Sequence, residues 1–337
     1  MQKYKELHIL KEWGKEFDIA EINDKSEDEL AKLKSLDIHG TINTFIPKEI
    51  GVLKNLKHLT ISFGDIDTLP SEIGDLSNLV SLELKHLKIK TLPASIGKLT
   101  KLKKLGIEYT PIETIPESIA NLHNLIHLEI SISELRELPL SICKLPKLRV
   151  LDLTRHTILN FPPEIGDLKE LRILITTTLN ASGIADTAHN PFPKEIMKLK
   201  NLKMLCCDLR EIPEAVCHMQ SLKVFGYGMH QLKSLPKSID KLLSKGFIEM
   251  SNIKDHKILK TIPNKEALLK GFKIVDRYRD EQQKAGYAER TIYRYNRVPI
   301  IKQISTEEFL NKKNLRNDII SQIAQRAVKQ MKENMGT

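Results

Sequence analysis

Residues 70–84 of this 337-residue chain read PSEIGDLSNLVSLEL, and the apolar pattern changes its period within this stretch. From Pro70 to Leu79 the apolar residues stand three apart behind a proline, which predicts the first turn of a short helix. Leu82 and Leu84 then alternate with polar residues, which predicts a short strand with both leucines facing inward. One such unit cannot bury its apolar side alone, so burial requires stacked neighbours.

The same phrase recurs along the chain with a constant period. Prolines at 47, 70, 93, 116, 139 and 162 are separated by 23 residues each time. An eight-residue excess precedes Pro193, and prolines at 213, 236 and 263 continue the pattern with altered spacing. Residues 41–263 are therefore predicted to form an α/β solenoid of roughly ten units. Its parallel strands should form one sheet on a concave face, with short helices or turns on the convex face.

The recurring phrase LPxxIGxLxxLxxLxLxxxxIxx resembles the 23-residue leucine-rich repeats of Ras-associated scaffold proteins, plant intracellular repeat proteins and bacterial repeat effectors. This resemblance covers about Leu33 to Pro263. It implies a curved horseshoe that acts as a protein-binding scaffold. It also leaves open an alternative function, that of a bacterial effector acting on a host protein. The family usually has asparagine after the strand, whereas this chain has Gly64, Leu87, Thr110, Ser133 and His156 there. A reshaped turn is expected around Leu87, which cannot replace the asparagine hydrogen bonds.

Both ends of an open stack need protection, because the terminal units expose apolar surface and unpaired strand edges. Residues 1–40 are predicted to be the N-terminal cap. Ser26 and Glu29 have the spacing of a capping box, and Trp13 and Phe17 are expected to close the open end of the core. Residues 264–337 are predicted to be a C-terminal cap and a basic helical tail.

The net charge of +10 is unevenly distributed along the chain. Residues 264–337 carry +7, and residues 1–263 are nearly balanced, so no basic face is expected on the repeats. Nucleic-acid or anionic-membrane binding through the tail is the alternative function, and a solvated cap helix is the competing interpretation. The tail residues with this potential are Tyr278, Tyr287, Tyr293, Tyr295, Arg277, Arg279, Arg290, Arg294 and Arg297.

Sequence motifs for catalysis are absent. The chain has no GxxxxGK[ST], no GxGxxG after a strand and no HExxH, so it is predicted to be non-enzymatic and to need no cofactor. Cys206 and Cys207 should face opposite sides of a strand, which argues against a metal site. Histidines 58, 86 and 127 are expected on the outer strand face beside glutamates, where solvated polar residues of a binding face are favoured over a His/Glu site.

Cysteine use and hydropathy bear on location. Four cysteines are too few and too unevenly placed for a disulfide framework, which favours a reducing compartment. No apolar run approaches the roughly 20 residues of a membrane span, and the N-terminal residues are charged where a signal peptide is apolar. A cytoplasmic protein without a transmembrane segment is expected, with delivery into a host cell left open.

The candidate binding site emerges when the repeats are aligned. The column before the second strand leucine is polar from Ser35 to His127 and apolar from Val150 onward, and the neighbouring outward column changes one repeat later, from Asp152 to Ile175. An apolar strip on a strand face predicts a protein-binding hot spot, although the 177–191 insertion is an alternative that would cover it. The predicted hot spot is Ile173, Ile175, Met204, Val224, Met229 and Phe247, with a polar rim of Glu129, Asp152 and Arg155.

Overall fold

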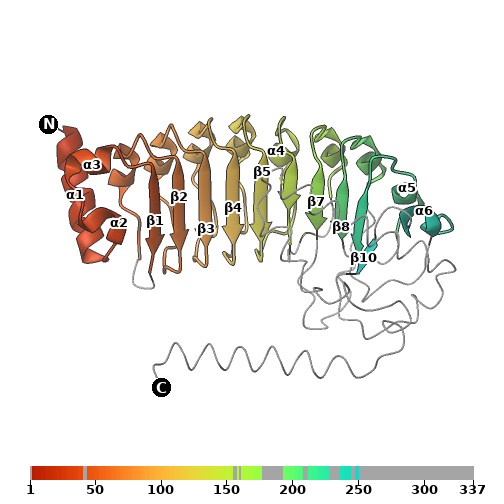
Figure 1. The fold of residues 1–337 in the computed structure, drawn as a ribbon, viewed down its shortest axis with the longest axis horizontal. Helices are drawn as coiled ribbons and strands as arrows, with labels where there is room; N and C mark the ends of the chain where they lie inside the picture. The colour runs from red at the N-terminus through yellow and green to blue at the C-terminus, as the bar shows by residue number, and fades with distance from the viewer. Residues whose placement is uncertain are drawn as a thin grey trace, which may run out of the picture. The chain divides into compact units, whose positions relative to one another are not determined.

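The fold is given by a computed structural model of the chain (Figure 1). It describes residues 2–40, 44–154, 158, 161–176, 193–207, 212–227, 236–243 and 247–249. The predicted boundary at residue 263, the expected last strand and the basic tail of residues 264–337 lie outside these residues. Among the described helices, none is long and apolar enough to cross a bilayer.

Ten described strands form one parallel sheet in which each strand pairs with the next one in the chain (Figure 1). The register keeps the inward leucines in line: Leu36 lies opposite Leu59, and Leu59 lies opposite Leu82. A slip of one residue would turn these side chains from the core to water. The strands are β1 (Ser35–His39), β2 (His58–Ser62), β3 (Ser81–Lys85), β4 (Lys104–Glu108), β5 (His127–Ser131), β6 (Val150–Asp152), β7 (Ile173–Thr176), β8 (Met204–Cys207), β9 (Val224–Tyr227) and β10 (Phe247–Glu249).

Each described repeat proline precedes a short helical segment, as the sequence predicts, and most of these segments are 3-10 helices. The Ile73 N–H donates to the Pro70 carbonyl at 3.1 Å, a bond across three residues that tightens the turn. The 3-10 helices are η1 (Lys48–Val52), η2 (Ser71–Asp75), η3 (Ala94–Lys98), η4 (Glu117–Asn121), η5 (Pro163–Asp167) and η6 (Lys194–Lys198). The α-helical segments of the repeats are α4 (Leu140–Cys143), α5 (Glu214–Cys217) and α6 (Ile239–Leu243).

One continuous core runs between the sheet and the helical segments. The inward strand pairs predicted from the alternation, such as Leu82 with Leu84, are fully buried in it. A column of asparagines, which the sequence analysis did not identify, links successive repeats: the Asn78 amide donates to the Lys54 carbonyl at 2.8 Å. The same bond recurs at Asn55, Asn124 and Asn201. These side chains satisfy backbone carbonyls that the sheet does not reach.

Three described helices precede β1. They are α1 (Gln2–Glu16), α2 (Ala20–Asn23) and α3 (Glu27–Ala31). The Ser26–Glu29 capping box is present, with the Ser26 N–H donating to the Glu29 carboxylate at 2.8 Å. Trp13 is 4% exposed and belongs to the core, and Phe17 packs against it, so both residues close the core as predicted.

The turn at Leu87 is hydrogen-bonded to the next repeat. The Leu87 N–H donates to the Thr110 hydroxyl at 3.4 Å, so a threonine supplies part of the bonding that asparagine would supply. Leu87 itself is buried in the core. The preceding residue, His86, has a φ of 52°, in the left-handed region, and the equivalent residues Phe63 and Tyr109 share this conformation. At this residue the backbone therefore shows no departure specific to the Leu87 repeat.

Candidate functional site

The predicted apolar strip lies together on β7, β8 and β9. Ile173 pairs in register with Met204, and Met204 with Val224, on the face of the sheet opposite the core, which we call the outer face. The expectation that these side chains face solvent is not met, because Ile173, Ile175 and Val224 are each 1% exposed and Met204 is 5% exposed. Burial of apolar side chains lowers the free energy of the folded chain, so a covered strip is the stable arrangement.

The remaining members of the predicted site lie wholly or partly outside the described residues. Met229, Arg155 and the 177–191 insertion lie outside the described residues. Phe247 begins β10, and its side chain also lies outside the description. The structure therefore brings together four of the six predicted hot-spot residues.

The predicted polar rim is buried as well. Glu129 and Asp152 are register partners on β5 and β6, and they are 5% and 0% exposed. The Asp152 carboxylate accepts a hydrogen bond from the Thr154 N–H at 2.9 Å, and Glu129 accepts one from the Ser131 hydroxyl at 3.3 Å. Both side chains are hydrogen-bonded within the sheet face. These bonds offset the cost of burying a polar group. The two side chains do not form a solvated rim.

Among the described residues, the accessible side chains on the outer face lie on β1 to β4 and are polar, although Ser62 and Glu108, which end β2 and β4, are buried. Among them Glu83 accepts hydrogen bonds from Lys104, at 2.5 Å, and from Lys85. Partial burial alone would raise the pKa of Glu83, but these two ammonium groups outweigh that effect and lower the pKa to about 2. Burial and then the Lys104 charge lower the pKa of His127, on β5, to about 4. His127 is therefore neutral at physiological pH.

The Glu83 ion pairs predict an acid-sensitive stability. The folded-state pKa of Glu83 lies below the ordinary 4.5, so its contribution is complete above about pH 4.5 and is lost as the pH falls toward about 2. We expect Glu83→Gln to lower the free energy of unfolding by about 1–3 kcal/mol at neutral pH and to flatten its decline in acid. Chemical denaturation at several pH values measures both effects.

Glu113→Gln, which breaks an exposed pair with Lys90, is the matched control. Equal pH profiles for the two variants would contradict the assignment.

A column of rings follows the strands on the accessible half of the face. Phe63, His86 and Tyr109 each stand directly after a strand, on three successive repeats. The rings of Phe63 and His86 stack with centroids 4.4 Å apart, and those of His86 and Tyr109 stack at the same distance. His39 adds a tilted contact with Phe63 at 5.0 Å. We call Phe63, His86 and Tyr109 the ring ladder.

The backbone of the ring ladder is strained. Phe63, His86 and Tyr109 have φ values of 58°, 52° and 50°, where L-residues other than glycine, asparagine and aspartate are uncommon. Each N–H nevertheless donates to the next repeat, as from Tyr109 to the Ser131 carbonyl at 3.1 Å. Phe63 is 43% exposed and Tyr109 is 44% exposed. Ile132, the equivalent residue after β5, has a φ of 56°, so this conformation belongs to the repeat turn, and the exposure of the rings is what distinguishes the ring ladder.

The ring ladder was missed in the sequence, and His86 was misplaced. The prediction put His86 on the outer strand face, but it follows β3 and leaves that face at the left-handed turn. The available signal was the column two residues after the last strand leucine, which reads Phe63, His86 and Tyr109. A periodicity argument assigns that column to a loop, and stacking across repeats becomes visible only when the register is known.

The four cysteines are all buried. Cys207 belongs to the core and Cys206 lies on the opposite face of β8, so the predicted alternation is confirmed. Within the part of the chain that the structure describes, no group of three His, Cys, Asp or Glu side chains has the arrangement of a metal site.

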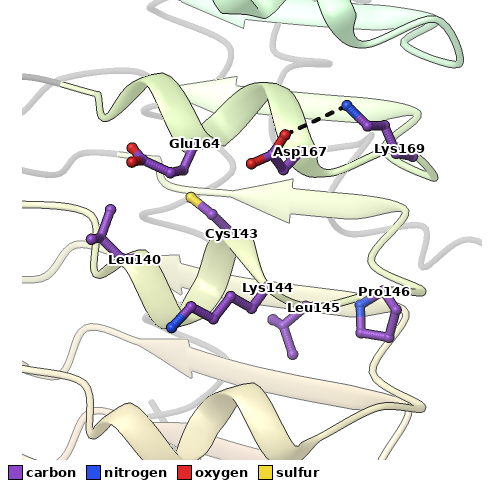
Figure 2. Close-up of a pocket in the computed structure, with 8 residues that line it drawn as sticks. All are labelled: Leu140, Cys143, Lys144, Leu145, Pro146, Glu164, Asp167 and Lys169. Carbon is purple, nitrogen blue, oxygen red and sulfur yellow. Dashed lines mark ion pairs between the residues drawn. The ribbon is translucent and has the colours of Figure 1, made fainter.

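A hollow of about 590 Å³ lies on the helical side of the sheet, lined by α4, η5 and the residues that follow them (Figure 2). Cys143 lines it from α4, and its sulfur faces the segment that carries Glu164 and Asp167. Burial, and then the charges of Glu164 and Asp167, raise the pKa of the Cys143 thiol to about 12. A thiol with this pKa is not a nucleophile at physiological pH. Cys143 stands at the position equivalent to Gly74 and Gly97. At those glycines an added Cβ would lie less than 3.0 Å from atoms of the next repeat.

Comparison with known proteins gives a consistent result. The family model for the leucine-rich repeat region matches residues 1–105 and 94–209. No curated protein matches the chain in sequence.

Solved structures with a similar fold come from several kinds of organism. An internalin from Listeria monocytogenes has a TM-score of 0.51 at 17% identity, with 66% of this chain and 62% of that chain covered. The ectodomain of the Arabidopsis thaliana receptor kinase GASSHO1/SCHENGEN3, solved with CASPARIAN STRIP INTEGRITY FACTOR 2, has a TM-score of 0.51 at 21% identity, with 65% and 27% covered. A Leptospira interrogans repeat protein has a TM-score of 0.46 at 24% identity, with 68% and 76% covered. At these identities the likeness concerns the fold.

Proposed function

This chain belongs to the leucine-rich repeat family, and we propose that it is a non-catalytic scaffold that binds a protein partner at the outer face of β1 to β4. The observation that carries the proposal is the ring ladder. Its rings are exposed, lie at the end of a polar strand face, and are held in place by stacking and by the backbone hydrogen bonds of the sheet. Aromatic residues on a rigid element are typical anchors of protein–protein interfaces.

The surroundings of the ring ladder support a protein partner. Accessible polar side chains on the same strands accompany it, including the exposed His58 of β2 and the half-buried Lys85, which ends β3 directly before His86. Aromatic side chains with polar neighbours are usual in a binding surface. The strip of Ile173, Ile175, Met204 and Val224 does not carry the proposal, because its side chains are at most 5% exposed. Structures of similar fold include a receptor solved with the factor named above, which is consistent with this use of the fold.

Replacing the ladder rings tests the proposal. We expect Phe63→Asn plus Tyr109→Asn to weaken partner binding by about a hundredfold, since truncating an interface anchor typically costs 2 kcal/mol or more. Stability should change little, because asparagine tolerates the left-handed conformation. Affinity capture with quantitative mass spectrometry identifies proteins lost from the variant, and titration of a purified partner gives the affinity.

The matched control is Tyr4→Asn plus Leu140→Asn, which removes two exposed side chains far from the ladder in the sequence. The same proteins should be captured by this control and by the parent chain. If the ladder variant retains every partner with unchanged affinity, the ring ladder is not the binding surface.

A further inference from the structure

The segments that lead into the strands gather positive charge on one edge of the sheet. These six-residue segments, 52–57, 75–80, 98–103, 121–126, 144–149, 167–172, 198–203 and 218–223, precede β2 to β9 at the tails of the arrows in Figure 1. We call them together the basic edge. They hold 14 lysines and arginines against 3 acids, a net charge of +11. The cations are Lys54, Lys57, Lys98, Lys101, Lys103, Lys144, Lys147, Arg149, Lys169, Arg172, Lys198, Lys200, Lys203 and Lys223.

The register aligns these charges in a row. The residue before each strand donates its N–H to the equivalent residue of the preceding repeat, as from Lys103 to Val80 and from Lys203 to Arg172, both at 2.8 Å. At about 4.8 Å between neighbouring strands, the basic edge is about 34 Å long. None of the 14 cationic residues is buried. The row is therefore a surface feature fixed by the fold.

Most of these cations have no acidic neighbour. The three acids are Asp75, Asp167 and Glu170, and each pairs within the edge, as Asp75 does with Lys54 at 3.7 Å. Nine cations have no carboxylate within 4.0 Å among the described residues: Lys57, Lys101, Lys103, Lys144, Lys147, Arg172, Lys198, Lys200 and Lys203. The Asn78 and Asn124 side chains accept hydrogen bonds from Lys101, at 2.6 Å, and from Lys147, at 2.7 Å, which orients two of the ammonium groups.

The basic edge corrects the charge analysis of the sequence. Residues 1–263 are nearly neutral as a whole, but outside the basic edge they carry a net −8. The remaining acids are spread over residues 1–39, the strands, the helical segments and the residues between them. The near-neutral total is a cancellation between the basic edge and the rest of residues 1–263, and only a repeat-by-repeat sum reveals it.

We propose that the basic edge binds the surface of an anionic lipid bilayer. Lysines near such a surface are attracted without specific geometry, each by up to about 1 kcal/mol. Of the 14 cations, 12 are lysines, whereas phosphate recognition in nucleic acids favours the fork of arginine. The segments of the basic edge contain no Phe, Tyr or Trp, so they offer no platform on which bases of a single strand could stack.

Binding in this way leaves the protein-binding face free. The strands run away from the basic edge, and the ring ladder follows their far ends, as at Phe63 after β2. A bilayer at the basic edge therefore meets the entering turns, and the outer face of β1 to β4 stands clear of it. The chain would present its partner site at a membrane surface.

Vesicle binding by the full chain tests the proposal. The variant Lys101→Gln, Lys103→Gln, Lys147→Gln and Lys200→Gln removes four charges from the basic edge. The control Lys48→Gln, Lys88→Gln, Lys90→Gln and Lys194→Gln removes four exposed charges elsewhere. With sedimented phosphatidylcholine–phosphatidylserine vesicles, we expect the first variant to lower the partition coefficient by about tenfold or more and the control to change it by less than about threefold. Added salt should weaken binding by the parent chain.

Three results would overturn the proposal. Equal losses in both variants would show that only total charge matters. Full retention by the basic-edge variant would assign any vesicle binding to another part of the chain, including the basic residues 264–337. Binding of duplex DNA that depends on the same four lysines, without binding to the vesicles, would assign the basic edge to nucleic acid.

Discussion

The double change Ile173→Asp plus Val224→Asp is expected to unfold the repeats under conditions in which the parent chain is folded. Both side chains are 1% exposed on the outer face, so each aspartate would enter a site without water. A buried charge without a partner costs about 3–5 kcal/mol, and two of them exceed a substantial part of the stability of a typical domain. Thermal melting followed by circular dichroism measures the loss.

The matched control places two aspartates at the same strand position in two other repeats, which are likewise two strands apart. Ser35 is exposed and Ser81 is half-buried, and they lie on β1 and β3 as Ile173 and Val224 lie on β7 and β9. Ser35→Asp plus Ser81→Asp should lower the melting temperature only slightly. If the two double variants melt alike, the apolar strip is accessible, and it regains its place as a candidate binding surface.

Gly74→Ala is expected to destabilise the chain by about 2–3 kcal/mol, although it adds a single methyl group. A Cβ at this position would lie 2.3 Å from the Ser95 carbonyl oxygen and 2.7 Å from the Ser95 Cβ in the next repeat. Backbone atoms hold the neighbouring turn in place, so the repeats would have to separate. Chemical denaturation gives the change in the free energy of unfolding.

Gly106→Ala is the control for this effect. Gly106 lies within β4, and the nearest atom to an added Cβ is the Glu83 Cγ at 3.7 Å, an ordinary contact. This change should be neutral or slightly stabilising, because alanine restricts the unfolded chain more than glycine does. Similar losses for both variants would mean that the close approach of the turns is not what glycine provides at position 74.

The fold could be predicted because its signal is local and repeated. Alternation at Leu82 and Leu84 sets the strand, the 23-residue period sets the register, and Ser26 with Glu29 marks the cap. The type of helix was less predictable, because proline followed by spaced apolar residues suits both α- and 3-10 helices, and the close approach at Gly74 depends on the next repeat.

The candidate site was less predictable for a related reason. The alignment correctly placed Ile173 and Val224 on the outer face, but strand alternation alone carries no signal that this face is buried there. The ring ladder and the basic edge both arise from residues 23 apart that meet only after stacking. Phe63 and Lys57 have no unusual neighbours in the sequence, and their importance comes from equivalent residues in adjacent repeats.

The most direct test of the proposed binding face is hydrogen–deuterium exchange of the full chain with and without its captured partner. Slower exchange is expected at the ends of β2, β3 and β4 and at the ring-ladder residues Phe63, His86 and Tyr109, with little change in β7 to β9. Slower exchange confined to β7, β8 and β9, with no change at the ring ladder, would contradict the proposed binding face.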